Sequence, residues 1–567
     1  MATTKGPKTN KKATEVEAPT FDHSDVLEEI VNLIKNRQQK GKAGPAVKPA
    51  PKGAPAEAED QIQIWEDDPF LEAVDGSEPV PAEPIPVDLP ENGQPSLQTE
   101  IVDPRPDPGI FDPTTAEFRY WNAESALARG VNFWGPLLPN GTVWSTQQAP
   151  MQVHLDEDVD FNAFYARDSG LNFFHGEVSN VQPPVTVFSG ESPGVVCHEL
   201  GHAILDAVKP ELFDAMSSEV GAFHEAFGDM SSMLTALQLP SFRDSVLQQT
   251  GGRLNANSRL SRLARQLGWA IRVQINPAAV DSDCLRNTSN RFFYHDPNGL
   301  PPSGPASQLT SEVHNFSRVF SGAFLDVLAA MFQIGGAGDS DQLEAVSVDA
   351  GKLLIEGVRL ASVGPGFYAQ VAAGMIQADH SLFNGRYRTA LTSSFVQRGI
   401  LSPPAAVTFS RDLQSHGGKA FGVTGLAPAK DRHKLSLQFE GDNEGYKKTA
   451  QNAPSLPLRP LLTRFGVAIY LHMPAEPNRF GVAPAALTGG TEKTYSPEED
   501  ARSYVEDLIQ RDRIAYEHAT DPIFSLLTTP GEVEPSEKTH RLVNENGKAV
   551  LKRNHFDCGL RGCRHGH

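Results

Sequence analysis

Two stretches decide the fold of this chain: Cys197-His198-Glu199-Leu200-Gly201-His202-Ala203 and, downstream, Gly221-Ala222-Phe223-His224-Glu225-Ala226-Phe227-Gly228-Asp229. Residues four apart on a helix face the same way, so His198 and His202 can present two imidazoles to one Zn²⁺. Glu199 then lies beside the remaining coordination position. The first stretch therefore predicts a zinc site of the kind that zinc hydrolases use.

The residues around the first motif give it clear helix ends. Ser192 is a favourable N-cap and Pro193 suits the first helical position, whereas Pro210 prevents the helix from continuing. The second motif falls in a predicted helix over 218–239. We therefore expect two antiparallel helices to meet at the metal.

The predicted site has the ligands of a catalytic zinc, which takes three protein ligands and leaves one position for a water whose pKa it lowers. His198 and His202 supply two ligands, and Glu225, 23 residues after His202, is the natural third. Asp229 can accept the free ring N–H of a ligand histidine. Glu199 is expected to hold the zinc-bound water and to act as its general base.

Over about 112–402 the chain resembles the thermolysin-like metallopeptidases, whose zinc ligands, catalytic glutamate and Glu-x-x-x-Asp segment match the residues above. Asn162-Ala163-Phe164-Tyr165 resembles the family strand whose asparagine and alanine hold the substrate backbone. Leu285-Arg286 is similar to the family's substrate-carbonyl arginine, and His314, 28 residues after Arg286, to its transition-state histidine.

The resemblance implies an α+β domain with a strand-rich N-terminal lobe and a helical C-terminal lobe, and zinc-dependent cleavage of peptide or protein substrates. Arg286 would clamp a substrate carbonyl, with a structural ion pair as the alternative. His314 would stabilise the charge on the scissile carbonyl oxygen, with helix capping as the alternative. Val195 and Leu285 match the pocket after the scissile bond, which implies cleavage before bulky apolar residues, although core packing explains either residue equally well.

One departure from the family concerns catalysis. Phe213 stands where the family has an oxyanion-binding tyrosine, and loss of one such donor costs about 2.7–4 kcal/mol. His314, the zinc, Tyr165 or Tyr294 would have to compensate. This departure favours a second hypothesis, a zinc-bound but catalytically weak or inactive module that binds peptide or protein partners through the same cleft.

Other features argue against particular ligands and partners. Gly194 and Ala236 replace an aspartate and a calcium-binding glutamate of the family, so calcium is not predicted at its paired site. The formal net charge of −20 over 567 residues argues against nucleic acid. No apolar h-region and no run of about eighteen apolar residues occurs, so we predict neither Sec export nor a membrane span. The protein is then expected to be cytoplasmic or exported by a non-Sec route, and its oligomeric state stays open.

We expect three parts along the chain. Residues 1–110 are predicted to be a largely disordered tail with Pro-rich linkers, containing one amphipathic helix over 22–39 that either docks on the protein's own surface or serves as a partner-binding or targeting helix. Residues 403–567 form a β-containing region of unknown role with a polar helix near 497–516. Between them lies the catalytic domain, 111–402, with further helices at 115–129, 258–273, 314–334, 341–362, 367–379 and 386–399.

The C-terminal tail carries ligand types of its own. Cys558, Cys563, His565 and His567 can hold a small metal site, the two cysteines can form a local disulfide, or the tail holds no site. The whole chain has only four cysteines, too few for a disulfide framework.

Overall fold

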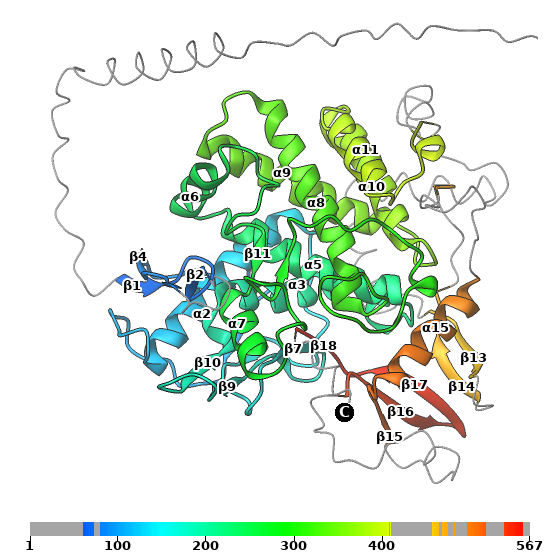
Figure 1. Cartoon of the computed structure of the whole chain (residues 1–567), viewed down its shortest axis with the longest axis horizontal. Helices are drawn as coiled ribbons and strands as arrows, with labels where there is room; N and C mark the ends of the chain where they lie inside the picture. The colour runs from blue at the N-terminus through cyan, green and yellow to red at the C-terminus, as the bar shows by residue number, and fades with distance from the viewer. Residues whose placement is uncertain are drawn as a thin grey trace, which may run out of the picture. The chain divides into compact units, whose positions relative to one another are not determined.

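A computed structural model describes most of the unit Glu59–His567 (Figure 1). The predicted helix over 22–39 lies outside the described residues. The structure describes residues 61–72, 80–407, 409, 456–463, 468–474, 480–482, 496–516 and 538–558.

Helices α3 (Pro193–Val208) and α5 (Ser218–Ala236) form the centre of the fold (Figure 1). Ser192 caps α3 and Pro193 begins it, as predicted. Every residue of α5 is buried, so this helix contacts other elements on all its sides. The two helices lie so close together that a Cβ on Gly201 would be only 3.0 Å from the Cα of Gly228, so this contact requires a residue without a side chain.

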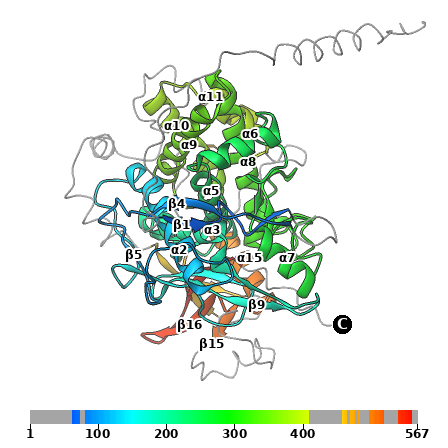
Figure 2. The same ribbon diagram turned by 90° about the vertical axis from the view of Figure 1, so that its left-hand side faces the viewer.

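The predicted helices of the second half form close to their expected bounds. Besides α3 and α5, the described residues include the helices α2 (Ala116–Trp134), α4 (Glu211–Asp214), α6 (Pro240–Thr250), α7 (Arg265–Gln274), α8 (Val313–Gly335), α9 (Ser340–Leu360), α10 (Phe367–Phe383), α11 (Arg388–Gln397) and α15 (Pro497–Gln510). Helices α8 to α11 gather above α5 in Figure 2, whereas α15 and the strands β5, β9 and β16 lie below it.

Helix α8 is the one helix of the described residues that is long and apolar enough to cross a membrane. Within its most apolar window, 72% is buried against the rest of the fold. Core helices of this length and composition pass the same test, and α8 packs against α5, α9 and α11.

The helix predicted over 258–273 is wrong in its first half. Residues Arg262–Leu263 form β11, which pairs antiparallel with β12 (Arg286–Asn287). Ala264 follows with φ +48°, so helix α7 begins only at Arg265. The same pairing fixes the backbone of Arg286 beside the central helices.

A five-stranded sheet in the order β18-β7-β8-β6-β5 lies against α3. β18 runs antiparallel to β7, β7 antiparallel to β8, and the pairs β8–β6 and β6–β5 are parallel. Its strands are β5 (Thr99–Ile101), β6 (Met151–His154), β7 (Ala163–Ala166), β8 (Gly170–Phe173) and β18 (His555–Asp557), and β9 (His175–Val178) and β10 (Val185–Phe188) form a separate pair.

Ordered structure begins well before the predicted start near Phe111. β1 (Gln61–Ile64) pairs with β4 (Ile85–Asp88), β2 (Phe70–Glu72) pairs with β3 (Val80–Pro81), and β5 extends the main sheet. Composition suggested linkers over 40–59 and 76–109, with a possible short strand at 61–65 between them; that strand forms as β1, its alternating side chains are buried in the main core, and its partner β4 lies within the second predicted linker. A few buried side chains therefore outweigh a Pro-rich and acidic composition.

Buried charges tie this N-terminal segment to the start of α3. The Asp67 carboxylate accepts hydrogen bonds from Arg259 at 2.5 Å and Arg265 at 2.7 Å. Its carbonyl oxygen accepts from Gly194 N, and the neighbouring Asp68 carboxylate accepts from the Ser192 hydroxyl. The segment thus supports the N-terminus of the helix that carries the predicted metal ligands.

The C-terminal region is not separate from the predicted catalytic domain. It forms a second five-stranded sheet covered by α15, and its last strand, β18, leaves that sheet to join β7. The strands of the second sheet are β13 (Leu458–Leu462), β14 (Ala468–His472), β15 (Ile514–Tyr516), β16 (His540–Glu545) and β17 (Lys548–Arg553).

Candidate metal centre and substrate cleft

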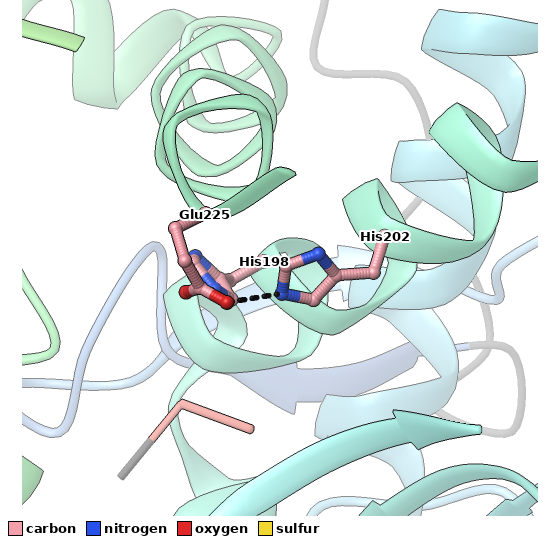
Figure 3. Close-up of side chains that lie close together, drawn as sticks. All are labelled: His198, His202 and Glu225. Carbon is pink, nitrogen blue, oxygen red and sulfur yellow. Dashed lines mark ion pairs between the residues drawn. The ribbon is translucent and has the colours of Figure 1, made fainter. Parts of the chain in front are cut away.

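His198 and His202 on α3 face Glu225 on α5 (Figure 3). Nε2 of His198 lies 3.4 Å from Oε2 of Glu225, and Nε2 of His202 lies 3.6 Å from Oε1. One ligand atom from each residue lies within 4.8 Å of the other two. A tetrahedral zinc with bonds of about 2.0–2.2 Å keeps its ligand atoms roughly 3.4 Å apart. His198, His202 and Glu225 thus lie together in space, as the sequence motifs predicted.

The donor atoms of this group fit a zinc ion. Both oxygens of Glu225 and Nε2 of His202 are buried and have no hydrogen-bond partner among the described residues. Leaving such atoms unsatisfied costs about 1–3 kcal/mol each. A cation at the point they share would satisfy them, and two imidazoles with one carboxylate are a familiar zinc set.

Glu199 lies directly after His198 on α3 and is fully buried. Both its oxygens lack a hydrogen-bond partner among the described residues, and one lies within 4.8 Å of a ring nitrogen of His198. Burial raises the pKa of Glu199 to about 8. Burial lowers the pKa of His198, but hydrogen bonds to Asp229 and Glu225 outweigh it and raise that pKa to about 9. A bound cation would displace such a proton.

Asp229, predicted to accept the free ring N–H of a ligand histidine, is in contact with His198. Its Oδ1 lies 3.2 Å from Nδ1 of His198 and accepts hydrogen bonds from Nη2 and Nε of Arg286 at 2.9 and 3.2 Å. Arg286 therefore makes the structural ion pair that was its alternative role. Its Nη1 also donates to the carbonyl oxygen of Cys558 at 3.4 Å, so Arg286 contacts the backbone directly after β18 as well.

His224 is a site residue that sequence reasoning missed. Its Nδ1 lies 3.1 Å from Nδ1 of His202. Burial lowers the pKa of both rings well below the ordinary value, so both are neutral and one nitrogen can donate to the other. The only signal in the sequence was that His224 immediately precedes Glu225.

His314 lies in the first turn of α8, but it does not cap that helix. The cap is Glu312, whose side chain accepts a hydrogen bond from Asn315 N at 2.9 Å. Nδ1 of His314 lies 2.7 Å from Oε1 of Glu312, and Nε2 donates to the carbonyl oxygen of Asp557. Burial lowers the pKa of His314, but Glu225 and Glu312 outweigh it and raise the pKa to about 10.

Ala163 begins the strand β7, and Asn162 comes directly before it. Asn162 is buried, and its Oδ1 accepts a hydrogen bond from Ala163 N at 2.9 Å. The carbonyl oxygen of Ala163 accepts a hydrogen bond from Cys558 N at 2.8 Å. The predicted substrate-binding strand thus pairs with a segment of the chain itself.

That segment, β18 with Cys558, fills the cleft. The ring of Phe556 stacks on His224, with centroids 3.9 Å apart, and on His202 at 5.1 Å. About 20 Å³ of space is left beside Glu225, His314 and Asp557, roughly enough for one water molecule.

Cys558 is a free thiol in this structure, and its Sγ lies within 4.8 Å of a His198 nitrogen and a Glu199 oxygen. The other tail residues considered for a metal site or a disulfide, Cys563, His565 and His567, lie outside the described residues. The part of the tail that is described therefore belongs to the main cleft.

Phe213 on α4 also contacts the cleft, because its ring meets that of Phe556 edge to face at 5.5 Å. The hydroxyl of Tyr165 donates to Asp206 at 2.9 Å, and that of Tyr294 donates to Glu219 at 3.3 Å. Both tyrosine hydroxyls thus donate to buried carboxylates. Of the side chains predicted to compensate for Phe213, only His314 donates to the backbone of the segment in the cleft.

Val195 and Leu285, the predicted pocket residues, are both buried in the main hydrophobic core. Each is only 1% exposed. Their position agrees with core packing, and a pocket role stays a prediction.

Comparison with known proteins points to the same class. No protein-family model matches the chain. Extracellular metalloproteinase 2 of Arthroderma gypseum is 26% identical over 217 residues, which cover 36% of this chain and 30% of that protein. The proteins of the same name from Trichophyton tonsurans and Arthroderma benhamiae are 25% identical over the same shares. The chain thus matches less than a third of the length of these relatives, and the similarity supports a metalloprotease.

Proposed function

We propose that this protein is a zinc-dependent, thermolysin-like endopeptidase with Glu199 as its general base. One observation carries the proposal: the unpartnered carboxylate of Glu199 lies beside His198, whose ring belongs to a His-His-Glu group with ligand atoms within 4.8 Å of one another. A buried, unpaired carboxylate is costly. Its presence beside such a group is explained if it works on a water at the metal.

When bound, zinc would polarise the scissile carbonyl and acidify water. Glu199 then accepts a proton from the attacking water and delivers it to the leaving amine. Asp229 and His224 orient the rings of His198 and His202 from behind.

The backbone of the substrate is held from two sides. Ala163 on β7, on the side of the strand that β18 occupies, offers its carbonyl oxygen, and Arg286 offers its guanidinium, which the ion pair with Asp229 keeps in place. His314 carries a proton on Nε2 and donates to the oxygen on which negative charge develops. Val195 and Leu285 would favour cleavage before bulky apolar residues.

A second candidate function is a catalytically weak module that binds peptides in the same cleft. Phe213 favours it, because a phenyl ring offers no hydrogen bond to the oxyanion. The pairing of β18 with β7 also favours it, since the cleft accepts an extended strand. Intact Glu199 argues for the enzyme.

A quenched-peptide assay separates the two functions. Because β18 fills the cleft, the assay uses Phe556→Ser, which removes the ring stacked on His224, with the exposed Phe293→Ser as the matched control. Each is measured with and without a zinc chelator and with Glu199→Gln added. We expect chelator-sensitive hydrolysis by Phe556→Ser that Glu199→Gln abolishes while zinc is retained. Equal inertness of both zinc-loaded proteins would exclude the enzyme and leave the weak binding module.

A further inference from the structure

The C-terminal segment His555–Cys558 lies in the cleft and makes the backbone contacts that are expected of a substrate. Its strand β18 adds to the edge of β7, and Cys558 N donates to the carbonyl oxygen of Ala163 at 2.8 Å. The carbonyl oxygen of Cys558 accepts from Arg286 Nη1 at 3.4 Å. The three groups predicted to hold a substrate are β7, Arg286 and His314, and this segment contacts all of them.

The register of these contacts singles out one peptide bond. The carbonyl oxygen that accepts from His314 belongs to Asp557, and the next N–H, which Ala163 accepts, belongs to Cys558. The bond between these two groups is Asp557–Cys558. Sγ of Cys558 lies within 4.8 Å of a Glu199 oxygen, so the general base lies beside this bond.

We propose that the chain is its own substrate and cleaves the Asp557–Cys558 bond, releasing residues 558–567. This inference rests on the proposed function. Water supplies both groups: its oxygen joins the carbonyl carbon of Asp557, which becomes a new C-terminal carboxylate, and its proton reaches the nitrogen of Cys558 through Glu199, which creates a new amino terminus. No oxidant or further reactant is needed.

The residues before the bond are firmly anchored, which favours cleavage within one molecule. The ring of His555 lies 4.6 Å from that of Phe164, and the ring of Phe556 stacks on His224. The Asp557 carboxylate accepts from Arg513 at 3.1 Å. Arg553, at the end of β17, donates to the carbonyl oxygen of Phe213 at 3.0 Å.

Until the bond is cut, the same segment keeps other substrates out of the cleft. Cutting separates Cys558 from the strand, so the contacts of Cys558 with Ala163 and Arg286 are lost and these two groups become free for another peptide, whereas the residues before the bond keep their anchors. We therefore expect the cleaved protein to hydrolyse added peptides faster than the intact one.

Intact-mass measurement of the full-length chain tests the proposal. The protein is purified in chelator, zinc is added, and mass is followed over time at two protein concentrations. We expect loss of residues 558–567 at a rate that does not depend on protein concentration. Glu199→Gln should stay intact even when mixed with wild type, and so should Cys558→Pro, which lacks the N–H that Ala163 accepts. The matched control Cys563→Ala should be cut like wild type.

The peptide assay of Phe556→Ser distinguishes failure of the self-cleavage proposal from failure of the proposed peptidase function. Zinc-dependent hydrolysis of the peptide by this variant, together with a wild-type chain that stays intact or is cut elsewhere, overturns self-cleavage and leaves the proposed function standing. If no variant hydrolyses peptide and no chain is cut, the proposed function fails and the inference fails with it. Cutting of Glu199→Gln at the same bond assigns cleavage to another protease and also overturns the inference.

Alkylation of Cys558 supplies a readout that needs no activity. In the metal-free Glu199→Gln protein, Cys558 should react slowly with iodoacetamide because it is buried in the cleft. Phe556→Ser should speed labelling at this residue by about tenfold, since a lost aromatic contact of roughly 1.4 kcal/mol corresponds to that factor. Equal, fast labelling of Cys558 in both proteins would show that the segment does not occupy the cleft. A third outcome would also overturn self-cleavage: the zinc-loaded wild-type chain stays intact, and Cys558→Ser gains peptidase activity. Cys558 would then be a thiolate that binds the zinc and blocks the cleft.

Discussion

Nδ1 of His202 lies 3.1 Å from Nδ1 of His224, so the ring of one predicted zinc ligand is oriented by the neighbour of another. The contact spans two helices, because His202 belongs to α3 and His224 to α5. His224 in turn stacks on Phe556. His224 therefore contacts both a predicted zinc ligand, His202, and the strand in the cleft, through Phe556.

Removal of this support should weaken zinc binding. We expect His224→Ala to lower zinc affinity by about 10–100-fold, the usual effect of losing a partner that orients a ligand ring. Competition with a chromogenic chelator measures the affinity. His154→Ala, on β6 and paired with Glu157, is the matched control and should bind zinc like wild type. An unchanged affinity of His224→Ala would contradict the orienting role.

The buried ion pairs of Asp67 should carry a large share of stability. Asp67→Asn leaves Arg265, which is fully buried, without its charged partner. We expect the free energy of unfolding to fall by about 3–5 kcal/mol in a urea titration. The exposed Asp244→Asn should stay within about 0.5 kcal/mol of wild type. A similarly small effect of Asp67→Asn would mean that the N-terminal segment is not anchored in this way.

Glu219 should make stability fall with rising pH. Burial raises its pKa from 4.5 to about 8. Between these values the folded state keeps a proton that the unfolded state has released, so the free energy of unfolding declines as pH rises through this window. Glu219→Gln should flatten the decline and raise the melting temperature at pH 8.5 by about 2–4 °C per kcal/mol relieved. The exposed Glu177→Gln is the control. Parallel pH profiles of Glu219→Gln and wild type would exclude this role.

Local sequence signals predicted the metal group well. The i, i+4 spacing of His198 and His202, the cap at Ser192 and the proline at 193 all act within one helix, and the structure has that helix. Glu225 needed a second helix, but the close approach of α3 and α5 depends on small residues that lie within the two motifs themselves. Such short-range patterns are readable without knowledge of the rest of the fold.

Long-range contacts were not readable in the same way. The strand β18 pairs with β7, more than half of the chain away in sequence, and nothing in His555–Asp557 marks that partner. Asp67 lies in a segment whose surroundings resemble a linker, and only its contacts with Arg259 and Arg265 make it structural. The helix predicted over 258–273 failed for the same reason, because pairing of β11 with β12 outweighed local helical pattern.

The most direct test of the central claim is the ratio of kcat/KM between Phe556→Ser and the double variant Phe556→Ser/Glu199→Gln, measured with equal zinc content. A general base contributes about 10²–10⁴-fold, so we expect the ratio to fall in that range. Zinc per chain should be close to one in both proteins. A ratio near one, with zinc present in both, would contradict the claim that Glu199 serves a zinc peptidase.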